Sequence, residues 1–179
     1  MEPAKEEILD AFLKSGKKHL LITGRRACGK TTLFNEIAHG LPGNEGAIRG
    51  ITTYTIPGMY VMLKDNFTGD ETVIGRVHKK DLVQDKNAMV PVREGFIRFG
   101  IPILESAVQS EQEWICIDEI GFLESENVRY QKVILEAFEK KRVMAITRKQ
   151  DLPFLNELKR RDDVYLVDMD EYASKNTNM

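Results

Sequence analysis

The feature that most constrains the fold of this chain is a glycine-containing turn between an apolar run and a helix-forming segment. The run His19–Thr23 reads HLLIT, and Gly24–Gly29 separates it from residues 30–39, which have a helical pattern. Glycine adopts backbone conformations that other residues avoid, so the chain can turn sharply here from a buried strand into a helix. An amphipathic helix is also expected earlier, at residues 3–14. This order of elements favours an α/β fold.

The last third of the chain repeats the alternation of strand and helix. Apolar runs at 114–117, 143–147 and 164–169 predict buried strands, and the segments between them predict helices at 126–141 and 152–161. Continuous apolar strands separated by helices are typical of a parallel sheet that is covered on both faces.

The middle of the chain has a different pattern. Residues 51–56 are rich in Thr, Tyr and Ile, which favour a strand, and residues 59–64 and 72–77 are expected to form a hairpin. A helix is expected over 94–111, with Pro102 at a helix start and not inside a helix. We therefore predict a mainly parallel sheet of about five strands with an antiparallel hairpin excursion.

Composition narrows the class of protein further. The chain has 179 residues, which predicts one domain over residues 1–179, and its 26 Lys and Arg against 28 Asp and Glu give no basic excess for nucleic acid. Its N-terminus is too acidic for a signal peptide, no apolar run approaches the roughly 18 residues of a membrane span, and Cys28 and Cys116 are too few for a disulfide framework. We expect a soluble, cytoplasmic protein that binds neither nucleic acid nor membrane. Nothing in the sequence indicates a protein partner.

The turn fits the pattern G-x-x-x-x-G-K-[ST], which is typical of a phosphate-binding loop. It reads GRRACGKT from Gly24 to Thr31. The N–H groups of such a loop wrap a phosphate, and the positive end of the following helix adds to the attraction. We expect Lys30 to reach the β- and γ-phosphates of a nucleoside triphosphate and the Thr31 hydroxyl to ligate Mg²⁺. The predicted nucleotide-binding residues are Gly24, Arg25, Arg26, Ala27, Cys28, Gly29, Lys30, Thr31 and Thr32.

A second candidate site follows the strand at 114–117, in the sequence WICIDE. Asp118 and Glu119 stand at the carboxyl end of this strand, where ligands bind in open α/β sheets. We expect Asp118 to hold Mg²⁺ through water and Glu119 to orient or deprotonate the attacking water. Neighbouring side chains of a strand diverge, so the two acids are expected to have different roles. By analogy, such an acidic pair also suggests a further strand between this strand and the one before the loop.

A cation on the γ-phosphate accelerates phosphoryl transfer, so an arginine is expected near it. Arg25 and Arg26 lie in the loop itself, and Arg148 follows the strand at 143–147. We favour Arg148 as this catalytic residue, and the Thr147 hydroxyl is the alternative contact to the γ-phosphate.

In these motifs the chain resembles a family of small P-loop nucleoside-triphosphatases. The family includes the thermophile NTPases and the human cancer-related NTPase and is often described as nucleotide-kinase-like. The matching segments read GRRACGKTTL at 24–33, RGITT at 49–53 and IDEIGFLES at 117–125. The resemblance spans nearly the whole chain and implies the P-loop NTPase fold. It also implies Mg²⁺-dependent hydrolysis of nucleoside 5′-triphosphates, ATP among them, with loose base preference.

The resemblance implies the roles given above for Lys30 and Thr31 of the loop and for the acids Asp118 and Glu119. Thr53 matches the Gly-apolar-x-Thr segment of the family. Two departures stand out. The family usually has an acidic residue after this threonine, where this chain has Tyr54, and often an Asn-Arg element near the C-terminus, where residues 167–170 read VDMD.

Two other functions use the same phosphate loop. A nucleotide or small-molecule kinase needs an acceptor pocket and a mobile lid that carries arginine. Residues 76–98 are the candidate lid, and Glu119 weighs against the kinase because an acid that activates water serves hydrolysis. The basic residues of that lid are Arg76, Lys79, Lys80, Arg93 and Arg98.

A GTP-dependent switch is the other alternative. Asp118–Gly121 reads DEIG and satisfies D-x-x-G, and Arg148–Asp151 reads RKQD, which is similar to the N-K-x-D guanine reader except for Arg148 in place of Asn. Turnover of ATP, GTP, CTP and UTP distinguishes the alternatives. A broad profile indicates the NTPase, GTP alone the switch, and turnover only with an acceptor the kinase.

Overall fold

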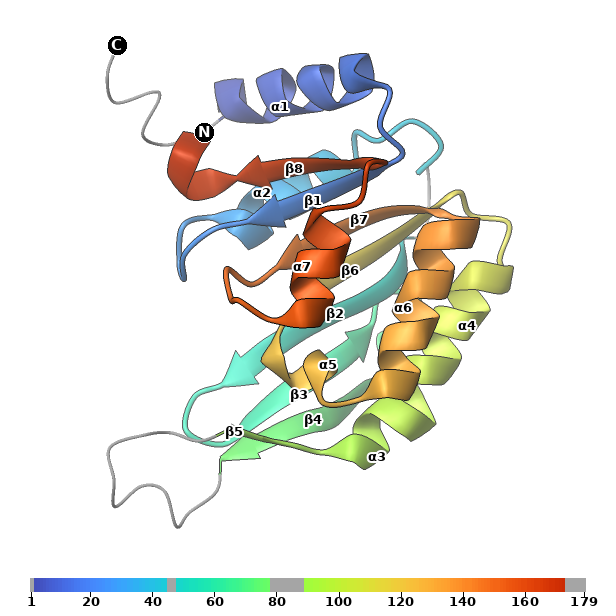
Figure 1. Ribbon diagram of the computed structural model, residues 1–179. Helices are drawn as coiled ribbons and strands as arrows, with labels where there is room; N and C mark the ends of the chain where they lie inside the picture. The colour runs from blue at the N-terminus through green and yellow to red at the C-terminus, as the bar shows by residue number, and fades with distance from the viewer. Residues whose placement is uncertain (1, 45–47, 78–88, 173–179) are drawn as a thin grey trace.

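The computed structural model describes residues 2–44, 48–77 and 89–172. Within these residues one sheet has the strand order β5-β4-β3-β2-β6-β7-β1-β8 (Figure 1). Its strands are β1 (His19–Thr23), β2 (Arg49–Ile56), β3 (Tyr60–Asp65), β4 (Glu71–Val77), β5 (Met89–Pro91), β6 (Trp114–Ile120), β7 (Arg142–Thr147) and β8 (Val164–Asp168). The helices are α1 (Glu2–Ser15), α2 (Lys30–Ala38), α3 (Arg93–Gly95), the π-helix η2 (Phe96–Gly100), α4 (Ile101–Gln109), α5 (Phe122–Ser125), α6 (Val128–Lys140) and α7 (Pro153–Lys159).

The strands that follow the predicted α/β alternation are parallel to one another. These are β2, β6, β7, β1 and β8, and β3, β4 and β5 extend the sheet in antiparallel fashion. The α/β fold and its antiparallel hairpin are therefore confirmed. Strand β7 lies between β1 and β6, as the acidic pair suggested. Since parallel strands end at the same edge, the segments after β1, β6, β7 and β8 meet there.

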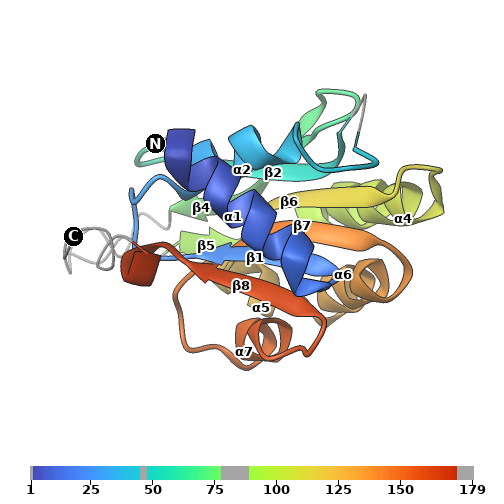
Figure 2. The same ribbon diagram turned by 90° about the horizontal axis from the view of Figure 1, so that it is seen from above.

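Alternate side chains of the central strands pack into two separate cores, one on each face of the sheet. Leu20 and Ile22 of β1 face α1 and α2, whereas Leu21 between them packs in the other core, with α4, α6 and α7. All three side chains are fully buried, which is why the run shows no alternation of polarity. Figure 2 looks onto α1, which lies over β8 and beside α2. Within the described residues, no helix is both long and apolar enough to cross a membrane.

The predicted helix over 94–111 is a continuous helical segment of three parts, α3, η2 and α4. The Ile101 N–H donates to the Phe96 carbonyl, five residues back, and this wider turn directly precedes Pro102, which has no N–H to donate. Pro102 thus stands in the first turn of α4 but inside a continuous helical segment, so the expectation that no helix precedes it was wrong: the wider turn of η2 accommodates the proline. At Gly100 a Cβ atom would lie 2.9 Å from the Tyr130 ring, so the glycine lets the η2–α4 segment pack closely on α6.

Candidate active site

A cavity of about 770 Å³ lies at the edge of the sheet where the parallel strands end. We call it the phosphate cavity. The structure brings most of the predicted site residues to it: it is lined by the loop after β1, by Glu119 and by the segment after β7. Its full lining is Gly24, Arg25, Arg26, Ala27, Cys28, Gly29, Lys30, Thr31, Thr32, Glu119, Arg148, Lys149 and Gln150. Residues up to 126 positions apart in the sequence therefore form one site.

The loop owes its shape to three residues with positive φ. Gly24 has φ 147°, Gly29 has φ 90°, and Ala27 is the one non-glycine residue with positive φ within the described part of the chain, at 56°. A Cβ atom on Gly24 would lie 2.9 Å from the Cys28 Sγ atom and 3.0 Å from the Met169 Cβ atom, so glycine is required for both conformation and space. The N-cap of α2, Gly29, offers no side-chain hydrogen bond, which leaves the first N–H groups of the helix to an anionic ligand.

Lys30 spans the loop from inside. Its Nζ atom donates to the carbonyl oxygens of Gly24 (3.1 Å) and Arg25 (2.7 Å), and the residue is only 9% exposed. A buried ammonium group needs such partners, because leaving a charge unpaired away from water is costly. The ammonium thus lies within the loop, where an arriving phosphate can replace the carbonyl oxygens as its partner.

Asp118 does not line the cavity; it is 5% exposed and lies within β6, which extends to Ile120 beyond the predicted strand at 114–117. Burial is the largest effect and raises the pKa of its carboxyl to about 6, while a hydrogen bond from the Thr31 hydroxyl and the charge of Lys30 lower it. A hydroxyl and a carboxylate side by side are hard oxygen donors, which suit Mg²⁺. No group of three or more His, Cys, Asp or Glu side chains gathers for a metal among the residues described, and Mg²⁺ at phosphate sites needs only one or two protein ligands.

Glu119 lines the cavity whereas Asp118 does not, so the two acids have different surroundings. The Glu119 N–H donates to the Thr53 hydroxyl at 3.1 Å, and its carboxylate accepts a hydrogen bond from the Arg148 Nε atom. A Cβ atom on Gly121 would lie 3.0 Å from the Arg148 Cδ atom, so the glycine gives the arginine room to cross the end of β6. The structure thus places Arg148 at the site, with Glu119 as its partner.

Comparison with known proteins agrees with this geometry. A family model described as NTPase matches residues 19–177. The chain belongs to this NTPase family. The nucleoside-triphosphatase THEP1 of Thermotoga maritima is 30% identical over 172 residues, which cover 89% of this chain and 88% of that protein, and THEP1 of Thermotoga sp. strain RQ2 is 29% identical with the same coverage. The crystal structure of THEP1 from the hyperthermophile Aquifex aeolicus has the same fold, with a TM-score of 0.68, 22% identity, and coverage of 84% of this chain and 89% of that one.

Sequence reasoning did not find the contribution of the segment after β8 to this NTPase-family site. Asp170 accepts the Arg25 N–H with both carboxylate oxygens, at 3.3 and 3.1 Å. The Lys149 Nζ atom lies 2.8 Å from an Asp168 carboxylate oxygen and 3.0 Å from one of Asp170. These acids clamp the phosphate loop to the segment after β7. The signal was the pair of acids in VDMD at 167–170, which stood out only as a departure from the family pattern.

The other predicted contacts lie away from the cavity. Thr147 is fully buried and lines neither this cavity nor a second cavity, of about 540 Å³, which adjoins it. Of the candidate lid residues, Arg98 forms an ion pair with Glu94 at 2.7 Å. Neither Arg76 nor Arg93, also in described segments, lines the phosphate cavity. The remaining two basic residues, Lys79 and Lys80, lie outside the described residues.

Proposed function

We propose that this chain hydrolyses nucleoside 5′-triphosphates, ATP among them, to the diphosphate and phosphate with Mg²⁺ as cofactor. The observation that carries the proposal is the meeting of the phosphate loop, the Thr31–Asp118 pair and Glu119 at one edge of the sheet. Membership of the NTPase family and the names of the relatives support it.

The loop would hold the triphosphate. Its residues with positive φ would turn successive N–H groups toward a phosphate, and the start of α2 would add its positive end. Lys30 would leave the Gly24 and Arg25 carbonyl oxygens for the β- and γ-phosphates, and Thr32 would lie near the α-phosphate.

Thr31 and Asp118 are the residues that would hold Mg²⁺. When bound, the ion neutralises charge on the β- and γ-phosphate oxygens. The buried position of Asp118 and its hydrogen bond from Thr31 keep the two oxygen ligands together before any ion arrives.

Glu119 would act on the attacking water. The water oxygen forms a bond to the γ-phosphorus while the bond from that phosphorus to the β–γ bridging oxygen breaks, and the water proton passes to the Glu119 carboxylate. Thr53 fixes the backbone of Glu119, and Arg148 holds its side chain. Because Arg148 also lines the phosphate cavity, its guanidinium can stabilise charge on the γ-phosphate.

The geometry does not favour a guanine-specific switch. Arg148, which stands in place of the Asn of the guanine reader, is directed to Glu119. Asp151, in the position of the base-reading acid, accepts a hydrogen bond from the Asn156 side chain at 2.6 Å and does not line the cavity. This arrangement favours a loose preference among the nucleotide bases.

Turnover of ATP, GTP, CTP and UTP by the wild-type protein and by Lys30→Ala tests the proposal. We expect Mg²⁺-dependent phosphate release from all four by the wild type. Lys30→Ala should abolish turnover and weaken nucleotide binding, because it removes the charge beside the β- and γ-phosphates. Unchanged hydrolysis in the variant, or turnover of GTP alone, would contradict the proposal.

A further inference from the structure

A second cavity, of about 540 Å³, adjoins the phosphate cavity. Arg26, Glu119 and Arg148 line both, so the two meet where the γ-phosphate is proposed to lie. The volume is in the range of sites that bind small organic molecules. We call this second space the acceptor cavity, because a molecule bound in it would lie beside the transferable phosphoryl group.

The lining of the acceptor cavity includes six apolar side chains: Pro57, Val61, Val77, Met89, Phe122 and Leu123. Val61 and Leu123, each 8% exposed, stand beside the half-buried Met89. Thr53 and Thr55 of β2 add two hydroxyl groups. An apolar wall with a few hydrogen-bonding groups is the ordinary make-up of a site for an organic molecule, whereas a site for water alone needs no such wall.

The charged side chains among the described lining residues of the acceptor cavity balance one another. The Arg148 guanidinium is paired with Glu119, and the Glu124 carboxyl, 5% exposed, accepts the Gly121 N–H at 2.7 Å. Among the described lining residues, the one other cation is Arg26, which belongs to the phosphate loop and lines the shared end. Among the described lining residues, a phosphate group would therefore find no cation besides the two arginines, of which one is paired with Glu119 and the other belongs to the phosphate loop.

We propose that the acceptor cavity binds a neutral, hydroxyl-bearing molecule of nucleoside size, and that the chain transfers the γ-phosphoryl group of a nucleoside triphosphate to that hydroxyl. The inference rests on the proposed function, because it uses the same triphosphate site. It adds a second substrate, of neutral charge, and a second activity.

The chemistry differs from hydrolysis only in the nucleophile. The acceptor oxygen forms a bond to the γ-phosphorus, the bond from that phosphorus to the bridging oxygen breaks, and the hydroxyl proton passes to Glu119. The products are a phosphomonoester and a nucleoside diphosphate, so all atoms and charges are conserved. From the sequence, Glu119 favoured hydrolysis over a kinase reaction, but a carboxylate that takes a proton from water can also take one from an alcohol at the same position, so Glu119 is compatible with both reactions. An organic acceptor that fills the apolar cavity also displaces water from the vicinity of the γ-phosphate.

The test is phosphorus NMR of the full chain with Mg²⁺, ATP and one of four nucleosides: adenosine, guanosine, cytidine or thymidine. A phosphomonoester resonance, separate from that of inorganic phosphate, reports transfer. In Thr55→Trp an indole is added to an exposed position that lines only the acceptor cavity. The matched control is Met59→Trp, which adds the same group to a 53% exposed position in the turn between β2 and β3, outside both cavities.

We expect phosphomonoester with at least one nucleoside, at least 10-fold less of it in Thr55→Trp, and no such loss in Met59→Trp. Hydrolysis of ATP without nucleoside should stay within about twofold in both variants. Phosphate release with no phosphomonoester from any nucleoside would overturn the second activity and leave hydrolysis standing, whereas loss of both activities in the wild type would contradict the proposed function itself. Transfer that survives in Thr55→Trp, or that prefers a nucleoside monophosphate, would overturn the neutral acceptor cavity.

Discussion

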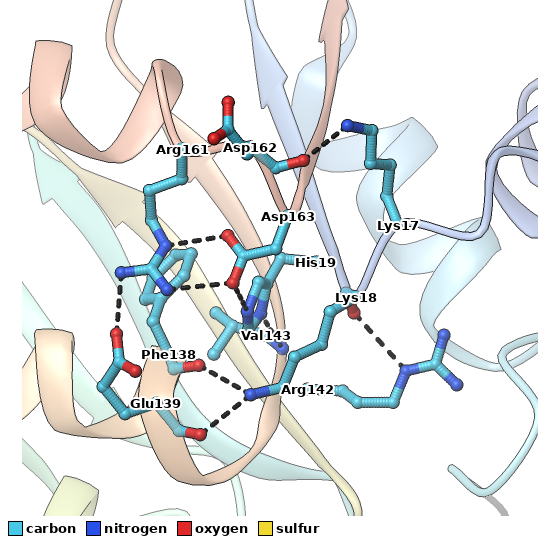
Figure 3. Close-up of polar contacts among 10 residues, drawn as sticks. All are labelled: Lys17, Lys18, His19, Phe138, Glu139, Arg142, Val143, Arg161, Asp162 and Asp163. Carbon is cyan, nitrogen blue, oxygen red and sulfur yellow. Dashed lines mark hydrogen bonds and ion pairs between the residues drawn. The ribbon is translucent and has the colours of Figure 1, made fainter.

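The buried histidine at the start of β1 makes the stability of the fold depend on pH in a way that can be measured. His19 is fully buried against the Phe138 ring, at 4.7 Å between centroids, and its Nδ1 atom accepts the Val143 N–H at 3.1 Å (Figure 3). This bond fixes the proton of the neutral ring on Nε2, which lies 3.3 Å from an Asp163 carboxylate oxygen. A second proton would go to Nδ1 and oppose the Val143 N–H, so the ring is held neutral.

The pKa of His19 is accordingly lowered from 6.5 to about 4. Burial is the largest cause, the charges of Lys18 and Arg161 lower the pKa further, and Asp163 opposes them. Between pH 6.5 and 4 the unfolded chain binds a proton here that the folded chain does not, so this group contributes stability above the window that is lost as pH falls through it. At about 1.36 kcal/mol per pKa unit, the loss on acidification is up to about 3 kcal/mol.

Urea unfolding of the wild type and of His19→Asn, from pH 7 to pH 4.5, measures this contribution. Asp118 and Glu124 have pKa values raised to about 6 and about 7, so they favour the folded state as pH falls and oppose the effect of His19. Both proteins contain these two acids, so the contribution of the acids cancels when the pH dependence of the variant is subtracted from that of the wild type. Between pH 7 and pH 4.5 we expect the free energy of unfolding of the wild type to fall by at least about 2 kcal/mol more than that of the variant. This is less than the full value of about 3 kcal/mol given above. NMR titration of the histidine should also show a neutral His19 ring at pH 5. Equal pH dependence in both proteins, or a ring that titrates near 6.5, would refute this reasoning.

Three substitutions extend the predictions to the site and the core. Arg148→Ala should lower kcat at least 10-fold in steady-state phosphate release, and a kcat within about twofold, some 0.4 kcal/mol of barrier, would exclude a role in the transition state. Asp170→Ala removes the acceptor of the Arg25 N–H, so the KM for ATP should rise several-fold in the same assay while kcat changes little, and an unchanged KM would contradict the clamp. Gly100→Ala brings a methyl group within 2.9 Å of the Tyr130 ring and should lower the free energy of unfolding by about 1–3 kcal/mol in urea, whereas a stabilised variant would show that the contact relaxes freely.

The parts of the fold that follow from local pattern were predictable from the sequence. The apolar run at 19–23 coincides with β1 because all five of its residues are buried, and the hairpin at 59–64 and 72–77 differs from β3 and β4 by one residue at its ends. The phosphate loop and the two acids in the last part of β6 were found because their residue types and spacing carry the chemistry directly.

Features that depend on tertiary contacts were not predictable in the same way. Strand β5 has three residues, too few for a periodicity, and is held by pairing with β4. The helix predicted at 126–141 begins at Val128 with Asn127 as its cap, because the preceding residues form the separate short helix α5. The bond from Arg25 to Asp170 joins positions 145 residues apart, and no local pattern indicates such a partner.

Glu119→Gln tests the central claim most directly, with Asp118→Asn as its matched partner. Glu119→Gln keeps the volume of a side chain that lines the phosphate cavity but removes its basicity. Asp118→Asn changes the proposed Mg²⁺ ligand, which is buried. Two quantities are measured for each protein: the affinity for ATP with Mg²⁺ by calorimetry, and phosphate release at saturating ATP over a range of Mg²⁺ concentrations.

We expect Glu119→Gln to bind ATP as the wild type does while its kcat falls by about 10²-fold or more, the range for loss of a positioned base. Asp118→Asn should instead require more Mg²⁺ for half-maximal turnover. A Glu119→Gln protein that releases phosphate at the wild-type rate would contradict the assignment of Glu119 as the group that activates water.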